Sequence, residues 1–263
     1  MNRINKLFKR LKKQKKKALI TYITAGYPDL GATKKLILKL AESGADLIEL
    51  GIPFSDPLAD GTTIQRASQQ SLLKGTNIIS ILRMVRSVRR AVETPFVFMT
   101  YYNPILHYGI KKFIKDSKAS GADGVIVPDL PPEEAKELID FSKKEDFSVI
   151  FLVAPTSTKN RLRIIAARST GFIYYVSLTG VTGARKKLPT DIVQHVKSLK
   201  KITKKPVCVG FGISNPDQAK KVSKTADGII IGSAVIKIIE KNSKSTLYEK
   251  VGNFIRSLKK AID

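Results

Sequence analysis

The chain has 263 residues, of which 43% are hydrophobic, and this is enough to bury a substantial core. Its formal net charge of +25 makes nucleic-acid binding a hypothesis to consider, but the sequence contains no RNA-binding aromatic motif, zinc-finger spacing or basic zipper. Outside residues 9–17 the lysines fall singly or in pairs, which favours a solvated surface and argues against a specific nucleic-acid site.

The chain also lacks the marks of secretion and of membrane insertion. Its single cysteine, Cys208, cannot form an internal disulfide, and the apolar run at 18–23 is shorter than a signal-peptide core. No stretch approaches the roughly 20 apolar residues that a membrane-spanning helix requires. We therefore expect a cytoplasmic protein with no role in a membrane.

The first predicted element is a basic amphipathic helix over residues 1–17. Ile4, Leu7, Phe8 and Leu11 lie on one side of it. We expect this helix to cover the N-terminal mouth of a barrel, and a helix lying on a membrane surface is the alternative.

Eight short apolar runs follow, separated by helical patterns. The runs are typical of buried parallel strands and cover residues 18–24, 46–50, 96–101, 124–127, 148–153, 171–176, 207–210 and 228–231. The helical patterns include 34–43 and 132–144, and the second opens with Pro-Pro-Glu-Glu. Eight such units in about 250 residues predict an α/β fold, a (β/α)8 TIM barrel with an extra N-terminal helix, as a single domain over residues 1–263. A dinucleotide-binding fold is disfavoured because no G-x-G-x-x-G follows the first strand.

The stretch at 48–61, IELGIPFSDPLADG, places three acids in an otherwise apolar segment. If side chains alternate along the second strand, Leu47 and Glu49 point into the barrel and their neighbours face the helices. Burial then raises the pKa of Glu49, which suits this carboxyl to donate and accept a proton near neutral pH. The alternative is a structural ion pair, but no basic residue occurs at a comparable strand end.

Two aspartates lie in the loop after this strand. Asp60 precedes Gly61, which allows the backbone to turn close to a ligand. Asp56, between a serine and a proline, is expected at the outer surface of the loop, either as a turn residue or as a contact. Long loops in a compact domain are usually functional, so this loop is a candidate part of the site.

Glycine-rich turns follow the last three predicted strands. They contain Gly180 and Gly183, Gly210 and Gly212, and Gly232 with Ser233. Backbone N–H groups at such turns, and at the start of the helices that follow, form a phosphate cradle that needs no basic side chain. Three such turns in succession favour a binding site for a phosphorylated substrate over glycine turns that serve only to reverse the chain.

Aromatic side chains near the predicted strand ends favour a flat ligand, although core packing is the commoner explanation for any one of them: Tyr22, Tyr101, Tyr102, Tyr174 and Phe211. His107 and His195 lie away from the strand ends, so we expect neither Ser-His-Asp chemistry nor a metal site. A phosphorylated substrate, an aromatic pocket and two acids without a metal indicate carbon–carbon cleavage or isomerisation driven by proton transfer.

Several motifs resemble those of the tryptophan synthase α-subunit family. The longest is ELGIPFSDPLADGTTIQ at 49–65, and the others are TAGYPD (24–29), MTYYNPI (99–105), GVIVPDLPPEE (124–134), GVTGAR (180–185) and VGFGIS (209–214). The resemblance runs over essentially the whole chain. It implies a TIM barrel lyase that cleaves indole-3-glycerol phosphate to indole and glyceraldehyde 3-phosphate, a retro-aldol reaction of tryptophan biosynthesis.

The resemblance also implies roles for individual residues. Glu49 resembles the general acid and base that protonates the indole ring at C3 and takes the proton from the glycerol hydroxyl. Asp60 resembles the carboxylate that holds the indole N–H, and Tyr174 matches a tyrosine counted with the active site. Further matches to phosphate, substrate-pocket and loop positions are Tyr22, Tyr101, Asp129, Thr182, Gly183, Phe211, Gly212, Gly232 and Ser233. Tyr22 stands where phenylalanine is common in this family.

A partner is implied as well. In this family a pyridoxal-phosphate β subunit receives the indole through a tunnel in an α2β2 assembly, and the α chain should itself need no cofactor. Asp56 resembles a residue of the surface that meets the β subunit. Two rival interpretations stay open: another phosphate-binding barrel of aromatic amino-acid or histidine biosynthesis, which would not place both acids in this segment, and a protein that binds nucleic acid through its basic surface.

Overall fold

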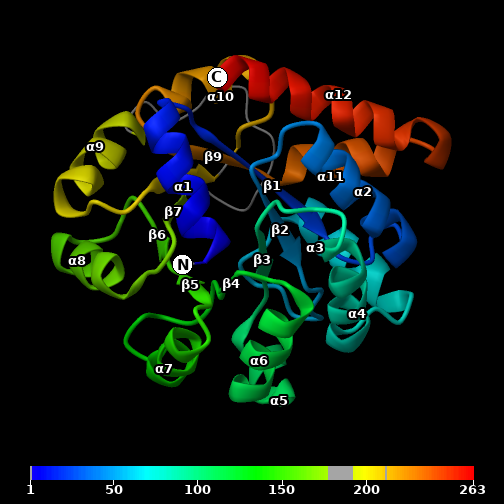
Figure 1. Cartoon of the computed structure of the whole chain (residues 1–263), viewed down its shortest axis with the longest axis horizontal. Coiled ribbons are helices and arrows are strands. Elements are labelled where there is room, and N and C mark those ends of the chain that lie inside the picture. Colours follow the sequence, from blue (N-terminus) through cyan, green and yellow to red (C-terminus); the bar gives the residue numbers. More distant parts are fainter. Residues whose placement is uncertain (1, 177–191, 211) are drawn as a thin grey trace.

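The computed structural model describes residues 2–176, 192–210 and 212–263, and in these residues parallel strands form a barrel surrounded by helices (Figure 1). The strands are β1 (Ala18–Thr24), β2 (Leu47–Gly51), β3 (Phe96–Met99), β4 (Gly124–Ile126), β5 (Ser148–Ile150), β6 (Leu152–Val153), β7 (Ile173–Val176), β8 (Val207–Gly210) and β9 (Gly228–Ile231). They pair in the order β5-β4-β3-β2-β1-β9-β8-β7-β6. The two ends of the sheet therefore belong to one segment of chain, and only Phe151 separates β5 from β6.

The helices in the described ranges lie outside the barrel, except for the first. They are α1 (Arg3–Gln14), α2 (Leu30–Glu42), α3 (Thr62–Leu73), α4 (Ile78–Arg89), α5 (Tyr102–Tyr108), α6 (Ile110–Ser120), α7 (Lys136–Lys144), α8 (Lys159–Arg168), α9 (Ile192–Ile202), α10 (Pro216–Ser223), α11 (Ser233–Lys241) and α12 (Lys244–Ile262). None of those described is long and apolar enough to cross a membrane.

The predicted barrel is confirmed, with differences at the ends of elements. The fifth predicted strand is two short strands, because the pairing with β4 stops at Ile150 and the pairing with β7 starts at Leu152. The helix expected from residue 132 begins at Lys136, since the Pro-Pro-Glu-Glu segment instead forms turns, with the Glu134 N–H donating to the Pro131 carbonyl at 3.1 Å. The helix expected from residue 34 begins at Leu30, because the Asp29 side chain accepts from the N–H of Ala32 and starts it earlier.

Helix α1 closes the N-terminal mouth of the barrel, as predicted (Figure 1). Its apolar side chains Ile4, Leu7, Phe8 and Leu11 are buried, and they pack with the inward-facing side chains of the strands. Phe8 and Phe172 have ring centroids 5.7 Å apart. This burial excludes the alternative of an apolar face that lies on a membrane.

A polar anchor fixes the start of α1. The Asn2 side chain donates to the Asp123 carbonyl at 2.7 Å and to the Ser148 hydroxyl at 3.0 Å, while its oxygen accepts from the N–H of Ile4 at 2.7 Å. The Asn2 amide thus both caps the helix and fastens it to the N-terminal ends of the barrel strands.

Candidate active site

Glu49 lies inside the barrel at the middle of β2. The alternation predicted for this strand is confirmed, because Leu47 belongs to the inner core cluster while Ile48 and Leu50 belong to the outer cluster that packs against the helices. In the parallel register, Glu49 lies opposite Tyr22 of β1 and Val97 of β3. The strand pairing therefore holds a carboxyl group between an aromatic and an aliphatic neighbour.

The surroundings of Glu49 disfavour its charged form. The residue is 0% exposed, and burial raises the pKa of its carboxyl to about 8. Neither of its carboxyl oxygens has a hydrogen-bond partner among the residues that the structure describes, and it forms no ion pair with them. The alternative of a structural ion pair finds no support in this part of the chain. An unpaired buried polar group is costly to the fold, so it is a candidate for function.

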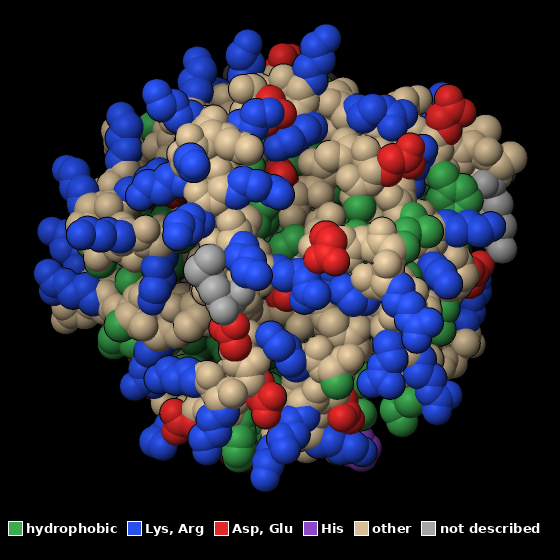
Figure 2. Space-filling view, in the orientation of Figure 1, with side chains coloured by type: hydrophobic (Ala, Val, Ile, Leu, Met, Phe, Trp, Pro, Cys, Tyr) green, Lys and Arg blue, Asp and Glu red, His purple; other side chains and the backbone are tan. Residues whose placement is uncertain are grey.

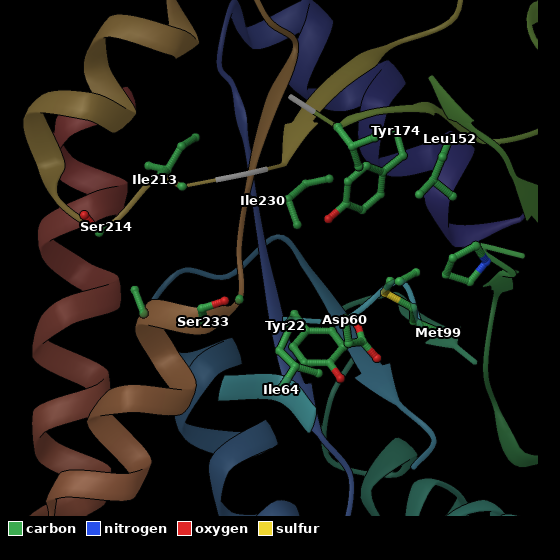
Figure 3. A pocket seen from close by; sticks show the side chains of 16 residues that line it. Tyr22, Asp60, Ile64, Met99, Leu152, Tyr174, Ile213, Ser214, Ile230 and Ser233 are labelled. Carbon is green, nitrogen blue, oxygen red and sulfur yellow. The ribbon is translucent and has the colours of Figure 1, made fainter. Parts of the chain in front are cut away.

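A cavity of about 120 Å³ opens beside Glu49 at the C-terminal ends of the strands (Figure 3). Tyr22 and Tyr174 enter it from different strands, and Met99, Leu152 and Ile230 supply apolar surface. Glu49 does not line the cavity, but its charge acts on the hydroxyl groups of both tyrosines, which do. The carboxyl therefore lies close to two of the residues that line the cavity, one of which, Tyr22, is its partner in the strand register.

Asp60 lines the same cavity, near the phenol of Tyr22 (Figure 3). Burial raises the pKa of its carboxyl to about 6, and a hydrogen bond from Tyr101 opposes this rise in pKa. The Tyr101 hydroxyl also accepts from the N–H of Ala59 at 2.9 Å, and the Tyr101 ring lies 5.5 Å from the ring of Phe54. Tyr101 thus fastens the loop that carries Asp60 to the end of β3.

Two glycines fit closely against the tyrosines of the site. A side chain at Gly51 would collide with the Tyr22 ring and hydroxyl, and one at Gly210 would collide with those of Tyr174. The Tyr22 hydroxyl lies 3.3 Å from the hydroxyl of Thr24. The sequence analysis missed this role of Gly51, although a glycine ending a buried strand is a signal of a close approach.

The glycine turns after β8 and β9 line the cavity. Gly212, with φ of 65°, lines it together with Ser214, and Gly232 and Ser233 line it at the start of α11 (Figure 3). The first N–H groups of a helix have no acceptor inside that helix, and its dipole favours an anion there. Three residues predicted for this region, Thr182, Gly183 and Phe211, lie outside the described residues.

The other two predicted residues lie away from the cavity. The Asp129 carboxylate accepts from the backbone N–H of Tyr102 at 3.0 Å and 3.1 Å, at the first turn of α5. Asp56 is exposed and accepts a hydrogen bond from Ser55 in the loop after β2. Asp129 therefore orders the start of α5, and Asp56 faces outward as expected.

The histidines also lie outside the cavity. His107 is exposed on α5, and the Nδ1 atom of His195 lies 3.0 Å from the hydroxyl of Tyr175, in the layer between β7 and α9. In the described ranges, no group of three or more His, Cys, Asp or Glu side chains could hold a metal ion.

Comparison with known proteins gives one consistent result. The family model described as "Tryptophan synthase alpha chain" matches residues 8–263. The tryptophan synthase alpha chain of Geotalea uraniireducens (strain Rf4) is 50% identical over 262 residues, which cover 100% of this chain and 98% of that relative. The corresponding chain of Thermoanaerobacter sp. (strain X514) is 49% identical over 263 residues, with 100% of both covered. The crystal structure of tryptophan synthase subunit alpha from Legionella pneumophila str. Paris has a TM-score of 0.93 and 41% identity, covering 100% of this chain and 99% of that chain.

Proposed function

The chain belongs to the tryptophan synthase alpha chain family and is a lyase that cleaves indole-3-glycerol phosphate, and we propose that Glu49 and Asp60 carry the proton chemistry of this cleavage. The resemblance seen in the motifs is thereby confirmed at the level of the family. The observation that supports the assignment of roles is the pair of carboxyls with different raised pKa values, about 8 and about 6, at one cavity.

The first step assigned to Glu49 is protonation. With a pKa of about 8, its carboxyl is mostly protonated at pH 7, so it is ready to give its proton to C3 of the indole ring. The absence of a hydrogen bond to any described residue leaves the carboxyl free to turn toward a substrate. As a carboxylate it then takes the proton from the glycerol hydroxyl next to C3. The carbon–carbon bond breaks, its electrons return to the ring, and indole and glyceraldehyde 3-phosphate form.

The role assigned to Asp60 is electrostatic. Its pKa of about 6 keeps it mostly ionised at pH 7, and Tyr101 holds it at the wall of the cavity. A carboxylate in this position accepts the indole N–H and stabilises the positive charge that the ring gains when C3 is protonated. Tyr22 and Tyr174 supply flat apolar surface for the ring.

The phosphate group is assigned to the glycine turns. Gly212, Gly232 and Ser233 line the cavity, and the labelled Ser233, where α11 begins, lies on the other side of Tyr22 from Asp60 (Figure 3). We also assign Thr182, Gly183 and Phe211 to substrate binding, and Asp129 to the ordering of the neighbouring loop. Asp60 and the N-terminus of α11 line different parts of one cavity, which suits a substrate that carries an indole and a phosphate at opposite ends.

The family name also implies a β subunit as partner. We propose an α2β2 heterotetramer in which the exposed Asp56 belongs to the contact surface, the pyridoxal phosphate resides in the β subunit, and this chain needs no cofactor of its own. We further propose that the chain is a single domain and acts in the cytoplasm. A specific nucleic-acid site is not part of this function.

The test of the catalytic assignment is the release of indole from indole-3-glycerol phosphate by the purified chain, alone and with a β subunit. Loss of a general acid and base lowers the rate by about 10²–10⁴-fold, so we expect at least this loss for Glu49→Gln. Glu249→Gln is the matched control, because it makes the same chemical change at an exposed position of α12. Full activity of Glu49→Gln would refute the role given to Glu49. Equal losses in Glu49→Gln and Glu249→Gln would show that the loss is not specific to position 49.

A further inference from the structure

Two surface grooves flank α1 on the N-terminal side of the barrel, and they differ in charge. The first contains Arg3, Lys6, Arg10 and Lys259 but also Glu42, Asp46 and Glu93. Its charges are largely paired: Arg3 lies 3.5 Å from Glu93, and Lys259 lies 2.8 Å from Asp46. Acids therefore balance the bases in this groove.

The second groove, called the basic groove below, is not balanced in this way. Its volume is about 470 Å³, and it lies between the end of α1 and the turn after α9. Its lysines are Lys12, Lys15, Lys16, Lys17, Lys200, Lys204 and Lys205. The described residues that line it include one acid, Asp227. The face that carries α1 shows many Lys and Arg side chains and few acids (Figure 2).

Some of these lysines have structural roles. Lys200 lies 2.7 Å from Asp227, and Lys16 lies 3.1 Å from Asp263. Lys205 donates to the carbonyls of Ala166 and Ser169 at the end of α8, and so caps that helix.

Four lysines remain without such a role. The side chains of Lys12, Lys15 and Lys204 are exposed and that of Lys17 is half-buried, and no described residue forms a hydrogen bond or an ion pair with these ammonium groups. Like charges held close together repel one another, and the repulsion is relieved when a polyanion replaces the bound salt ions.

The fold creates this cluster from distant parts of the chain. Residues 12–17 contain the end of α1 and residues 200–205 contain the end of α9, and the 182 residues from 18 to 199 separate them in the sequence. In the sequence these lysines form short runs typical of a solvated surface. The tertiary fold brings them to one groove, which is also lined by Phe8 and Leu11 of α1 and by Pro206 before β8.

We propose that the basic groove binds the phosphate backbone of nucleic acid without sequence preference. A linear polyanion fits a groove with lysines on both walls. The one aromatic residue among the described lining residues, Phe8, is 7% exposed, so it is unable to stack with a base, and readout of sequence is not expected. A membrane surface fits less well, because the apolar face of α1 is buried in the barrel and has nothing to insert into lipid.

The groove is independent of the active site. It is lined by residues that precede strands, such as Lys17 before β1 and Pro206 before β8, whereas the catalytic cavity is lined by residues that follow strands. The two sites therefore open on opposite sides of the barrel. Binding at one leaves the other accessible, and this activity goes beyond the lyase reaction.

The test measures binding of a fluorescent, mixed-sequence, single-stranded oligonucleotide by anisotropy, over about 50–200 mM salt. The variant reverses the three unpaired charges that are exposed: Lys12→Glu, Lys15→Glu and Lys204→Glu. The matched control reverses three exposed lysines of α6, Lys111, Lys112 and Lys115, which changes the net charge by the same amount. Each phosphate contact to a single strand contributes a slope of about 0.7 in log affinity against log salt, so the groove variant should lose about 2 from the slope.

At 0.1 M salt this corresponds to a loss of affinity of about 100-fold for the groove variant, while the control keeps an affinity within a few-fold of the parent chain. Indole release should be unchanged in both variants, which shows that both remain folded. Equal losses in the two variants would mean that binding follows net charge alone and would overturn the proposal. So would an unchanged affinity in the groove variant, or tighter binding to anionic phosphatidylserine vesicles than to the oligonucleotide.

Discussion

Replacing Glu49 by glutamine should stabilise the fold while it removes activity, and the gain should depend on pH. In the unfolded chain the Glu49 carboxyl has a pKa near 4.5, and in the fold its pKa is about 8. Because folding raises the pKa of this acid, the free energy of unfolding is highest below pH 4.5, where the carboxyl is protonated in both states. It falls as the pH rises from 4.5 toward 8, where the unfolded chain releases the proton more readily. Glutamine carries no charge, so the Gln variant avoids this loss.

The size of the effect follows from the shift in pKa. Each pH unit between the two pKa values is worth about 1.4 kcal/mol, which gives a destabilisation of about 3 kcal/mol at pH 7 from the buried carboxylate. Glu49 is fully buried, so solvent does not screen this effect. Relative to the parent chain, Glu49→Gln should therefore gain about 2–3 kcal/mol in free energy of unfolding between pH 5 and pH 7.

Urea denaturation at several pH values, followed by circular dichroism, measures this difference. Comparison across pH removes any constant effect of the amide itself, because only the ionisable side chain responds to pH. Glu249→Gln, on the surface of α12, should show no such trend. A difference between Glu49→Gln and the parent chain that stays constant from pH 5 to pH 8 would refute the assignment of a dehydrated carboxyl.

Three further predictions concern other contacts. Asp60→Asn should lower kcat/KM about 10²–10³-fold, and it should also remove the acid limb that we expect near pH 6 in the pH–rate profile of the parent chain; an unchanged pH–rate profile would contradict the role of Asp60. Gly51→Ala should destabilise the fold by about 1–3 kcal/mol in urea titrations because its methyl group meets the Tyr22 phenol, and adding Tyr22→Phe should recover part of the loss; no recovery would exclude this contact as the cause. The buried Asp123 carboxylate lies 3.5 Å from the largely buried Arg89 guanidinium, so Asp123→Ala should lower the free energy of unfolding by about 3–5 kcal/mol, and a loss as small as that of an exposed aspartate would be inconsistent with this ion pair.

Much of the fold was predictable because local patterns determine it. Alternation along β2 predicted that Glu49 points inward, and the amphipathic pattern of α1 predicted its buried face. The predicted start of α7 was wrong. A Pro-Pro-Glu-Glu segment can begin a helix or form turns, and the local sequence does not decide between these two conformations.

The features that were missed depend on contacts between distant residues. The fit of Tyr22 against Gly51 joins two strands, and the basic groove joins the ends of α1 and α9. Neither has a local pattern. The fifth strand likewise divides at Phe151 because pairing with β4 ends before this residue and pairing with β7 begins after it.

Helix α1 has a consequence for chemistry at the other end of the barrel. Its four apolar side chains seal the lower opening, and the sealed interior reaches up to Tyr174 and Cys208, beside the carboxyl of Glu49. If the helix detached, water would rise through the barrel and hydrate that carboxyl from beneath, and its acidity would return toward that of an ordinary glutamate. The raised pKa of Glu49 thus depends on a helix at the N-terminal end of the barrel, so damage to the first turns of the chain should lower the rate of indole release in the same way as loss of the proposed proton donor.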